Sequence, residues 1–224
     1  MKKVLMTTRR QPARGLDSAF STVLKAIALT FLTASASAEG IVDGDVEAGK
    51  AKSITCSACH GAEGISANPL WPNLAGQGAP YIVAQLRNFK EGRRNNALMN
   101  AQAMLLSDQD MNDLAAYFAS LPPAVQSVAN ESLVDRAEAL YRGGHSENGV
   151  PACLACHGPQ GRGNAAAAYP ALNGQHATYT NKTLGDYASG ERKSDGQVQI
   201  MRTISQRLTP EDREALASYL QGLR

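Results

Sequence analysis

Beyond residue 38 the sequence has no apolar run as long as the ~20 residues that a membrane-spanning helix needs. It also has almost no segments in which apolar and polar residues alternate, as they do in half-buried strands. Loops that contain glycine and proline separate helical patterns instead. These absences argue against a membrane span in residues 39–224 and against a β-rich domain, and they predict an all-α fold.

The first 38 residues have the order of a secretory signal. Basic residues near the start precede a mostly apolar run over residues 19–34, and the small-residue sequence ASA ends at Ala38. This order is typical of an exported precursor that is cleaved after its last small residue. Lys25 interrupts the run and leaves it too short for a membrane anchor. We therefore expect a signal peptide over 1–38.

The charge balance argues against nucleic acid as a partner. The sequence has 22 Lys and Arg and 20 Asp and Glu, but the first 38 residues hold six of the basic residues and one of the acidic residues. The remaining chain has 16 basic and 19 acidic side chains, a formal charge of −3. The basic excess therefore belongs to the predicted signal, and the mature chain does not favour binding to nucleic acid.

The mature chain is a tandem repeat. WPNLAGQGAPY, which ends at Tyr81, matches YPALNGQHATY, which ends at Tyr179, and LSDQDMNDLAAYFASL, which ends at Leu121, matches LTPEDREALASYLQGL near the C-terminus. Two prolines and small polar residues separate the copies. We place the first domain at 39–121, the linker at 122–131 and the second domain at 132–224. Domains of this size are marginal without a covalent staple or cofactor.

Each copy has three helical patterns. The last pattern in each begins with a capping sequence, since Ser107 precedes Asp110 by three residues and Thr209 precedes Asp212 by three. The earlier helices are predicted over residues 45–55, 80–90, 135–141 and 177–187.

Each copy also contains the motif CxxCH, which admits a zinc site, a redox dithiol or an attachment site for haem c. Its members are Cys56, Cys59 and His60 in the first copy and Cys153, Cys156 and His157 in the second. The two pairs are 97 residues apart, too far along the chain for a simple four-ligand zinc motif. A dithiol motif expects a preceding strand, and a structural disulfide does not need the histidine. Haem attachment uses every member, because both thiols form thioethers and the histidine ligates iron.

A second iron ligand is suggested by the repeat. Methionine, a second histidine or no ligand would favour, in that order, electron transfer at high potential, electron transfer at low potential, or an open iron. Met99 lies eight residues before Ser107, and Met201 lies eight residues before Thr209. A methionine near a helix is usually a flexible core filler, but the shared offset favours these two as ligands.

Other candidate residues receive weaker expectations. His145 and His176 have no counterparts in the other copy, so we expect them to face solvent and assign them no role. Four cations are candidates to pair with haem propionates, although exposed loop cations are commoner. They are Arg93, Arg94, Arg192 and Lys193.

These motifs resemble class I cytochromes c, and specifically the dihaem, two-domain, periplasmic cytochrome c4 family. The resemblance covers nearly all of the mature chain and implies two class I cytochrome c domains, each around one covalently attached haem c. It implies that Pro72 and Pro170 present backbone carbonyls to His60 and His157. It also implies that Met99 and Met201 are the methionine ligands. The first copy departs by being four residues shorter between its glycine, Gly92, and its methionine than the second.

The resemblance implies a periplasmic electron carrier rather than an enzyme. It implies a quinol-oxidising complex or another cytochrome as donor and a terminal oxidase of the respiratory chain as acceptor, with membrane association only through such partners. A dihaem peroxidase or a gas-binding protein with one open iron is the alternative, and an electron-transfer subunit of a dehydrogenase would use the same residues.

The two copies differ in net charge. The first copy has 6 basic and 9 acidic residues, a charge of −3, and the second has 10 basic and 9 acidic residues, a charge of +1. One hypothesis is that the two copies dock different partners with electrostatic steering. The alternative is that such small differences carry no meaning, because net charge alone does not locate a patch.

Overall fold

The computed structural model describes residues 42–224, so the predicted signal peptide lies outside the described residues. Within 42–224 the chain is helical, and its strand-like pairings are two isolated bridges, His145 with Val150 and Asn164 with Tyr169. The prediction of an all-α fold is confirmed. No helix in this part of the chain is both long enough and apolar enough to cross a membrane.

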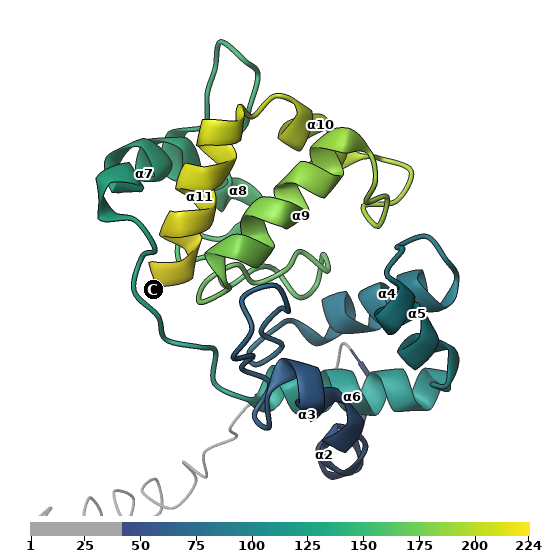
Figure 1. Cartoon of the computed structure of the whole chain (residues 1–224). Helices are drawn as coiled ribbons and strands as arrows, with labels where there is room; N and C mark the ends of the chain where they lie inside the picture. Colours follow the sequence, from purple (N-terminus) through teal and green to yellow (C-terminus); the bar gives the residue numbers. More distant parts are fainter. Residues whose placement is uncertain (1–41) are drawn as a thin grey trace, which may run out of the picture. The chain divides into compact units, whose positions relative to one another are not determined.

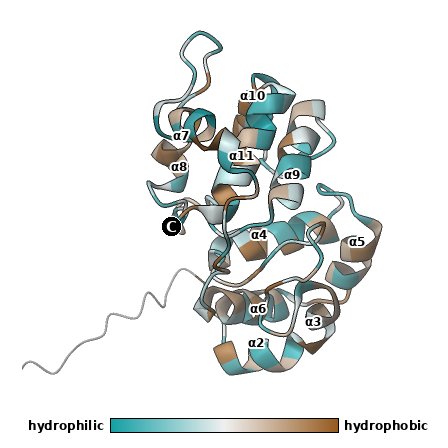
Figure 2. Ribbon diagram, turned by 60° about the vertical axis from the view of Figure 1, so that its left-hand side comes forward, coloured by the Kyte–Doolittle hydropathy of each residue, from teal (hydrophilic) through white to brown (hydrophobic). Residues whose placement is uncertain are grey.

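The helices of each repeat gather into a group of their own (Figure 1). The first repeat contains α2 (Val46–Lys52), α3 (Ile54–His60), α4 (Ala79–Lys90), α5 (Ala97–Met104) and α6 (Asp108–Ser120). The second contains α7 (Val134–Gly143), which follows the 3-10 turn η1 (Glu131–Leu133), then α8 (Leu154–His157), α9 (Ala177–Ser189), α10 (Ile200–Gln206) and α11 (Pro210–Gly222). Most helices carry both hydrophilic and hydrophobic residues, as expected of helices that bury one face (Figure 2).

The two capping sequences start the last helix of each repeat, as predicted. The Ser107 hydroxyl accepts a hydrogen bond from the Asp110 N–H, and the Asp110 carboxylate accepts one from the Ser107 N–H. Thr209 and Asp212 form the same reciprocal pair at the start of α11. These capping boxes satisfy backbone donors that would otherwise lack partners at the helix ends.

The helix expected over residues 45–55 is instead two helices. Ser53 lies between α2 and α3, and its hydroxyl donates to the Lys50 carbonyl at 2.8 Å. Serine competes in this way with the helical backbone, so the single-helix prediction was wrong at this position. The division gives the residues of the first CxxCH motif a helix of their own.

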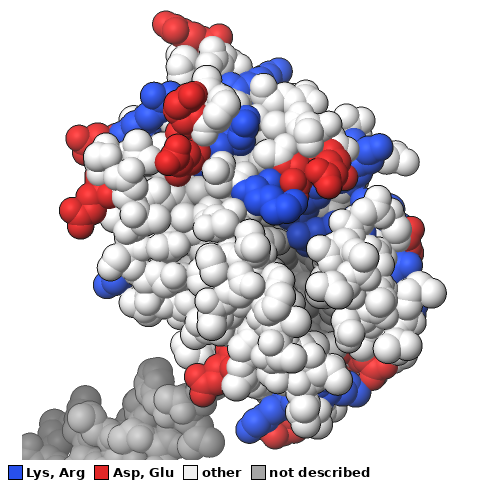
Figure 3. All heavy atoms as spheres, viewed as in Figure 1, with Lys and Arg blue, Asp and Glu red and all other residues white. Residues whose placement is uncertain are grey.

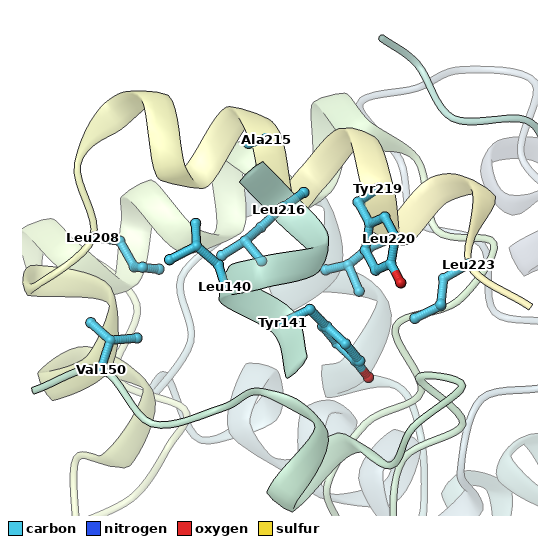
Figure 4. Close-up of a cluster of buried hydrophobic side chains, with 10 residues drawn as sticks. Leu140, Tyr141, Val150, Leu208, Ala215, Leu216, Tyr219, Leu220 and Leu223 are labelled. Carbon is cyan, nitrogen blue, oxygen red and sulfur yellow. The ribbon is translucent and has the colours of Figure 1, made fainter. Parts of the chain in front are cut away.

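The last helix of each repeat packs on the helix that comes first in that repeat. In the second repeat, Leu140 and Tyr141 of α7 face Leu216 and Leu220 of α11, and all four side chains are buried (Figure 4). Burying a leucine side chain contributes about 1.5–3 kcal/mol. The Tyr141 hydroxyl also donates to the Gly158 carbonyl at 2.6 Å, which joins this core to the residue after the second CxxCH motif.

A cation joins the same two helices in each repeat. Lys52 of α2 pairs with Asp110 at 2.9 Å and with Asp113 at 2.5 Å, both on α6. Arg136 of α7 pairs with Asp212 of α11 at 2.6 Å. Asp110 and Asp212 occupy equivalent positions, so one carboxylate both caps the last helix and anchors the first.

Candidate functional site

The first CxxCH motif occupies α3. Cys56 and Cys59 are three residues apart, almost one helical turn, and His60 is the last residue of the helix. The chain leaves α3 through Gly61, whose φ of 80° is a conformation that favours glycine. Both thiols are half-buried, and His60 is buried. Burial raises the pKa of the Cys56 thiol, as in an apolar site.

The second CxxCH motif has the same arrangement on a shorter helix. Cys153 caps α8, Cys156 lies within it and the buried His157 ends it, followed by Gly158 at a φ of 77°. Burial raises the pKa of Cys153 to about 11. All four cysteines of the chain lie in the described residues, and none of them forms a disulfide. Each pair therefore has two free sulfurs for a thioether-linked group.

Each motif histidine bonds to the carbonyl of a proline. His60 Nδ1 lies 2.8 Å from the Pro72 oxygen, and His157 Nδ1 lies 2.9 Å from the Pro170 oxygen. The carbonyl can only accept, so Nδ1 carries the proton and Nε2 keeps its lone pair for a metal. Burial lowers the pKa of both imidazoles, and the carbonyl opposes that shift. A neutral ring with a free Nε2 is what iron ligation requires.

The candidate methionines lie on two short helices that sequence periodicity missed. Met99 is in α5 and Met201 is in α10, and both side chains are half-buried. The other methionines of the first repeat are placed differently, since Met104 is 62% exposed and Met111, on α6, is fully buried. Met99 is therefore intermediate in exposure between Met104, which faces solvent, and Met111, which is buried in the core.

The second repeat offers space and an unpaired polar atom near its methionine. An open, largely apolar hollow of about 580 Å³ lies between the segment before the CxxCH motif and α10, and Val150, Pro151, Ile200 and Ile204 line part of it. Ser205 lies four residues after Met201, on the same helix face. Its buried hydroxyl has no hydrogen-bond partner within residues 42–224. As chemical groups, two thiols, a neutral imidazole and a thioether fit a haem c. The hollow itself is lined by none of Cys153, Cys156, His157 and Met201.

His176 does not face solvent as expected. It is half-buried, and its Nε2 donates to the Ser66 carbonyl at 2.9 Å, across the two repeats. His145 is also half-buried, in a small bridge with Val150, and its Nδ1 accepts from the Asn148 N–H at 3.3 Å. The expectation of solvent-facing rings was therefore wrong, because contacts made by the folded loops are not visible in a single-copy pattern.

Two of the four candidate cations are not simple exposed loop residues. Arg192 is only 4% exposed and donates to Tyr81 of the first repeat at 2.8 Å. Its counterpart, the half-buried Arg94, donates to Tyr179 of the second repeat at 2.8 Å. Burial alone raises the pKa of Tyr179, but the two arginines outweigh it and lower that pKa to about 7. Arg93 and Lys193 are exposed, as expected.

Two glutamines that sequence analysis did not single out also make contacts across the two repeats. The side chain of Gln77 bonds to the backbone of Ala171, and the side chain of Gln175 bonds to the backbone of Asn73. The available signal was that each glutamine follows its proline, Pro72 or Pro170, by five residues. That spacing shows that the two glutamines occupy equivalent positions. It does not show that each glutamine binds a residue of the other copy.

Comparison with known proteins places this arrangement in a family. The family model for cytochrome c matches residues 46–122 and again residues 136–224. A cytochrome c4 of Pseudomonas aeruginosa is 48% identical over 180 residues, which is 80% of this chain and 89% of that protein. The crystal structure of reduced recombinant cytochrome c4 from Pseudomonas stutzeri matches 81% of this chain and all of its own, with a TM-score of 0.78 and 44% identity.

A third relative bears a name that specifies a redox partner. The thiosulfate dehydrogenase electron acceptor of Thiomonas intermedia is 36% identical over 173 residues, covering 75% of this chain and 78% of that protein. It is more distant than the two cytochromes c4 described above, which are 48% and 44% identical to this chain.

Proposed function

The chain belongs to the cytochrome c family and to its dihaem cytochrome c4 group, and from this membership we propose how its residues hold the cofactors and which partners it serves. Like its cytochrome c4 relatives it is an electron carrier with two tandem cytochrome c domains and two covalently bound haem c. The resemblance inferred from the motifs is therefore confirmed at the level of family, fold and cofactor.

The proposed attachment and ligand sets are one per repeat. Cys56 and Cys59 form the thioethers in the first repeat, with His60 and Met99 as iron ligands. Cys153 and Cys156 form the thioethers in the second, with His157 and Met201 as iron ligands. The observation that carries this assignment is the pair of hydrogen bonds at 2.8 and 2.9 Å that leaves Nε2 of each motif histidine free.

The protein residues make this site suited to electron transfer rather than to substrate chemistry. When bound, each haem supplies one iron that cycles between the ferric and ferrous states. The histidine and the methionine of each set would both hold the iron, and they would leave it no free place for a substrate. The proline carbonyls hold each imidazole in one orientation, which keeps structural change between the two states small. The thioether sulfur of methionine favours the ferrous state and raises the reduction potential.

The carrier is proposed to work in the periplasm, after cleavage of a signal peptide near Ala38. Its donor would be a quinol-oxidising complex or another cytochrome, and its acceptor a terminal oxidase of the respiratory chain. The similarity to a thiosulfate dehydrogenase electron acceptor supports a second candidate, in which a dehydrogenase is the donor. Stopped-flow reduction by each donor class, with the fully loaded protein, distinguishes the two.

Charge supports separate docking of the two partners. On the face seen in Figure 3, charged side chains gather mainly over the second repeat, and a wide area over the first repeat is uncharged. The net charges of −3 and +1 for the two copies add to this contrast. Electrostatic steering should make the two docking rates respond differently to salt. Identical salt dependence for donor and acceptor would refute separate docking.

The ligand assignment is tested by the optical spectrum of the purified protein, oxidised and reduced. Methionine bound to ferric haem gives a weak far-red band, which is quantified per haem after a separate assay of haem content. Full intensity for two haems supports Met99 and Met201. Half intensity or none, together with carbon monoxide binding to the reduced protein, would indicate an open iron and favour a peroxidase or gas-binding protein.

A further inference from the structure

Two glutamines cross between the repeats in a reciprocal arrangement. Gln175 Oε1 accepts from the Asn73 N–H at 2.9 Å, and Gln175 Nε2 donates to the Asn73 carbonyl at 2.9 Å. Gln77 Oε1 accepts from the Ala171 N–H at 2.8 Å, and Gln77 Nε2 donates to the Ala171 carbonyl at 3.0 Å. Each side chain therefore binds one residue of the opposite repeat through both of its polar atoms.

The residues that they bind directly follow the two prolines. In the peptide group that joins Pro72 to Asn73, the carbonyl accepts from His60 at 2.8 Å while the N–H donates to Gln175. One planar peptide group thus connects the imidazole of the first repeat to a glutamine of the second.

An equivalent connection runs from the second repeat to the first. In the peptide group that joins Pro170 to Ala171, the carbonyl accepts from His157 at 2.9 Å while the N–H donates to Gln77. Two chains of hydrogen bonds therefore run across the interface, each from a histidine of one repeat to a glutamine of the other.

Hydrogen bonds in such a chain strengthen one another. When a peptide N–H donates to an acceptor, resonance moves electron density onto the carbonyl oxygen of the same group, which becomes a better acceptor. A better acceptor at Nδ1 makes the imidazole more electron-rich, and an electron-rich axial ligand stabilises ferric iron. Acceptance by the glutamine should therefore lower the reduction potential.

We propose that Gln77 and Gln175 are positioning residues that each tune the reduction potential of the haem in the opposite repeat, through the peptide group that holds its histidine. This proposal rests on the proposed function, because it requires His60 and His157 to be iron ligands. It gives the interface between the repeats an electronic role in addition to its structural one.

The two glutamines should differ in how strongly they change the reduction potential. Gln77 is 8% exposed, whereas Gln175 is only half-buried. Water can replace a lost acceptor more easily at the more exposed position. Removing Gln77 should therefore have the larger effect, and that effect should fall on the haem of the second repeat.

The test measures both reduction potentials in the loaded full-length protein, with haem methyl NMR resonances assigned to each repeat. In Gln77→Leu we expect the second-repeat haem to become about threefold easier to reduce at fixed potential, about 30 mV for one electron. The first-repeat haem should stay unchanged. Gln175→Leu should shift the first-repeat haem in the same direction by a smaller amount. The Nδ1 proton resonance of the affected histidine should move upfield, as a weakened hydrogen bond requires.

Matched variants separate tuning from a structural effect. Gln126 donates to the Gly174 carbonyl at 2.8 Å, and this bond does not involve a peptide group that holds a histidine. Gln126→Leu should leave both potentials unchanged. If Gln77→Leu or Gln175→Leu does not fold, Gln77→Met and Gln175→Met keep the side-chain length while removing the acceptor, and the same shifts are expected.

Three results would overturn the proposal. They are a shift confined to the haem of the glutamine's own repeat, equal shifts of both haems, and unchanged potentials in variants that retain both haems. A wild-type protein without histidine and methionine ligation would refute the proposed function and this inference together. With wild-type ligation intact, unchanged potentials would refute the inference alone.

Discussion

Four residues after its candidate methionine, the first repeat has Ala103, fully buried, and the second has Ser205, equally buried but with a hydroxyl that finds no partner within the described chain. The cation that crosses to the other repeat is half-buried as Arg94 and 4% exposed as Arg192. The histidine–proline hydrogen bonds, in contrast, are 2.8 and 2.9 Å. The histidine–proline pairs proposed to hold iron are therefore nearly identical in the two repeats. The residues around them differ, and these differences can give the two haems different reduction potentials.

The largest effect should come from removing one methionine at a time. In Met99→Ala the far-red band should fall to half, and the reduced protein should bind one carbon monoxide for every two haems. The potential of that haem should fall by more than about 59 mV, a tenfold change, because the thioether favours ferrous iron. Met201→Ala should give the same result in the second repeat, if the repeats are equivalent at the iron.

Met104→Ala is the matched control, since that methionine is on α5 and 62% exposed. It should leave the band and carbon monoxide binding unchanged. A full band in Met99→Ala would mean that another side chain ligates the iron of the first repeat.

The two crossing arginines should differ in their contribution to stability. Arg192→Gln removes donors to Tyr81, Gln85 and Ser194 in a buried setting and should lower the free energy of unfolding by about 2–3 kcal/mol. Arg94→Gln should cost less, because Arg94 is half-buried. Urea denaturation of the loaded protein measures both.

The neighbouring Lys193 is exposed, and Lys193→Gln should change stability by less than about 0.5 kcal/mol. Equal costs for the Arg94 and Arg192 variants would show that burial does not distinguish the two positions.

Acid should destabilise both repeats, since each has two carboxylates whose pKa is lowered in the folded state. Hydrogen bonds from Ser107 and Lys52 lower the pKa of Asp110, and the bond from Lys52 lowers that of Asp113. A lowered pKa in the folded state contributes stability above the unfolded pKa of about 3.9, and this stability is lost as pH falls through the folded value. The second repeat has two such carboxylates. Burial raises the pKa of Asp212 but Arg136 and Thr209 lower it on balance, and hydrogen bonds from its own N–H and from Thr209 lower the pKa of the exposed Glu211.

We therefore expect the free energy of unfolding to fall below about pH 4, and Asp113→Asn to reduce its dependence on pH. Denaturation at a series of pH values, followed through signals from each haem, measures this. An unchanged pH dependence in the variant would show that Asp113 is not part of the acid response.

The smallest effect should follow from exchanging Ser205 and Ala103. Ser205→Ala removes an unpaired buried hydroxyl, so stability should change by less than about 0.5 kcal/mol or increase slightly. If the hydroxyl bonds to the methionine sulfur or to the haem, the potential of the second haem alone should shift. Ala103→Ser should shift the first haem in the opposite direction. Potentiometry on both variants decides whether this position contributes to the difference between the haems.

The features that could be predicted from the sequence are local or recur at a fixed spacing in the two copies. Both CxxCH motifs, both capping boxes and the equivalence of Met99 and Met201 depend on residues close together in the chain. The helices α5 and α10 were missed because they span only eight and seven residues, and apolar residues are spread around α5 rather than gathered on one face. The break at Ser53 was missed because it depends on one side-chain hydrogen bond.

Contacts between the copies were beyond sequence reasoning for a different reason. The burial of Arg192 and the hydrogen bond of His176 depend on how the two repeats pack, and no spacing within one copy encodes that packing. The glutamines were visible as a shared position, yet a shared position is equally typical of a residue that serves its own copy.

The exchanged glutamines and arginines give this single chain the interface of a symmetric homodimer. Each contact occurs twice with the roles of the two halves reversed, which is the isologous pattern of a two-fold axis. In a true homodimer, any substitution would change both halves at once. Here the two halves are separate stretches of one chain, so a residue in one half can change while the equivalent residue in the other half stays the same. Asn73 and Ala171, which occupy equivalent positions, already differ in this way. Two equivalent haem sites can thus acquire different properties, so that electrons pass preferentially from one half to the other. The contacts that hold the halves together are kept.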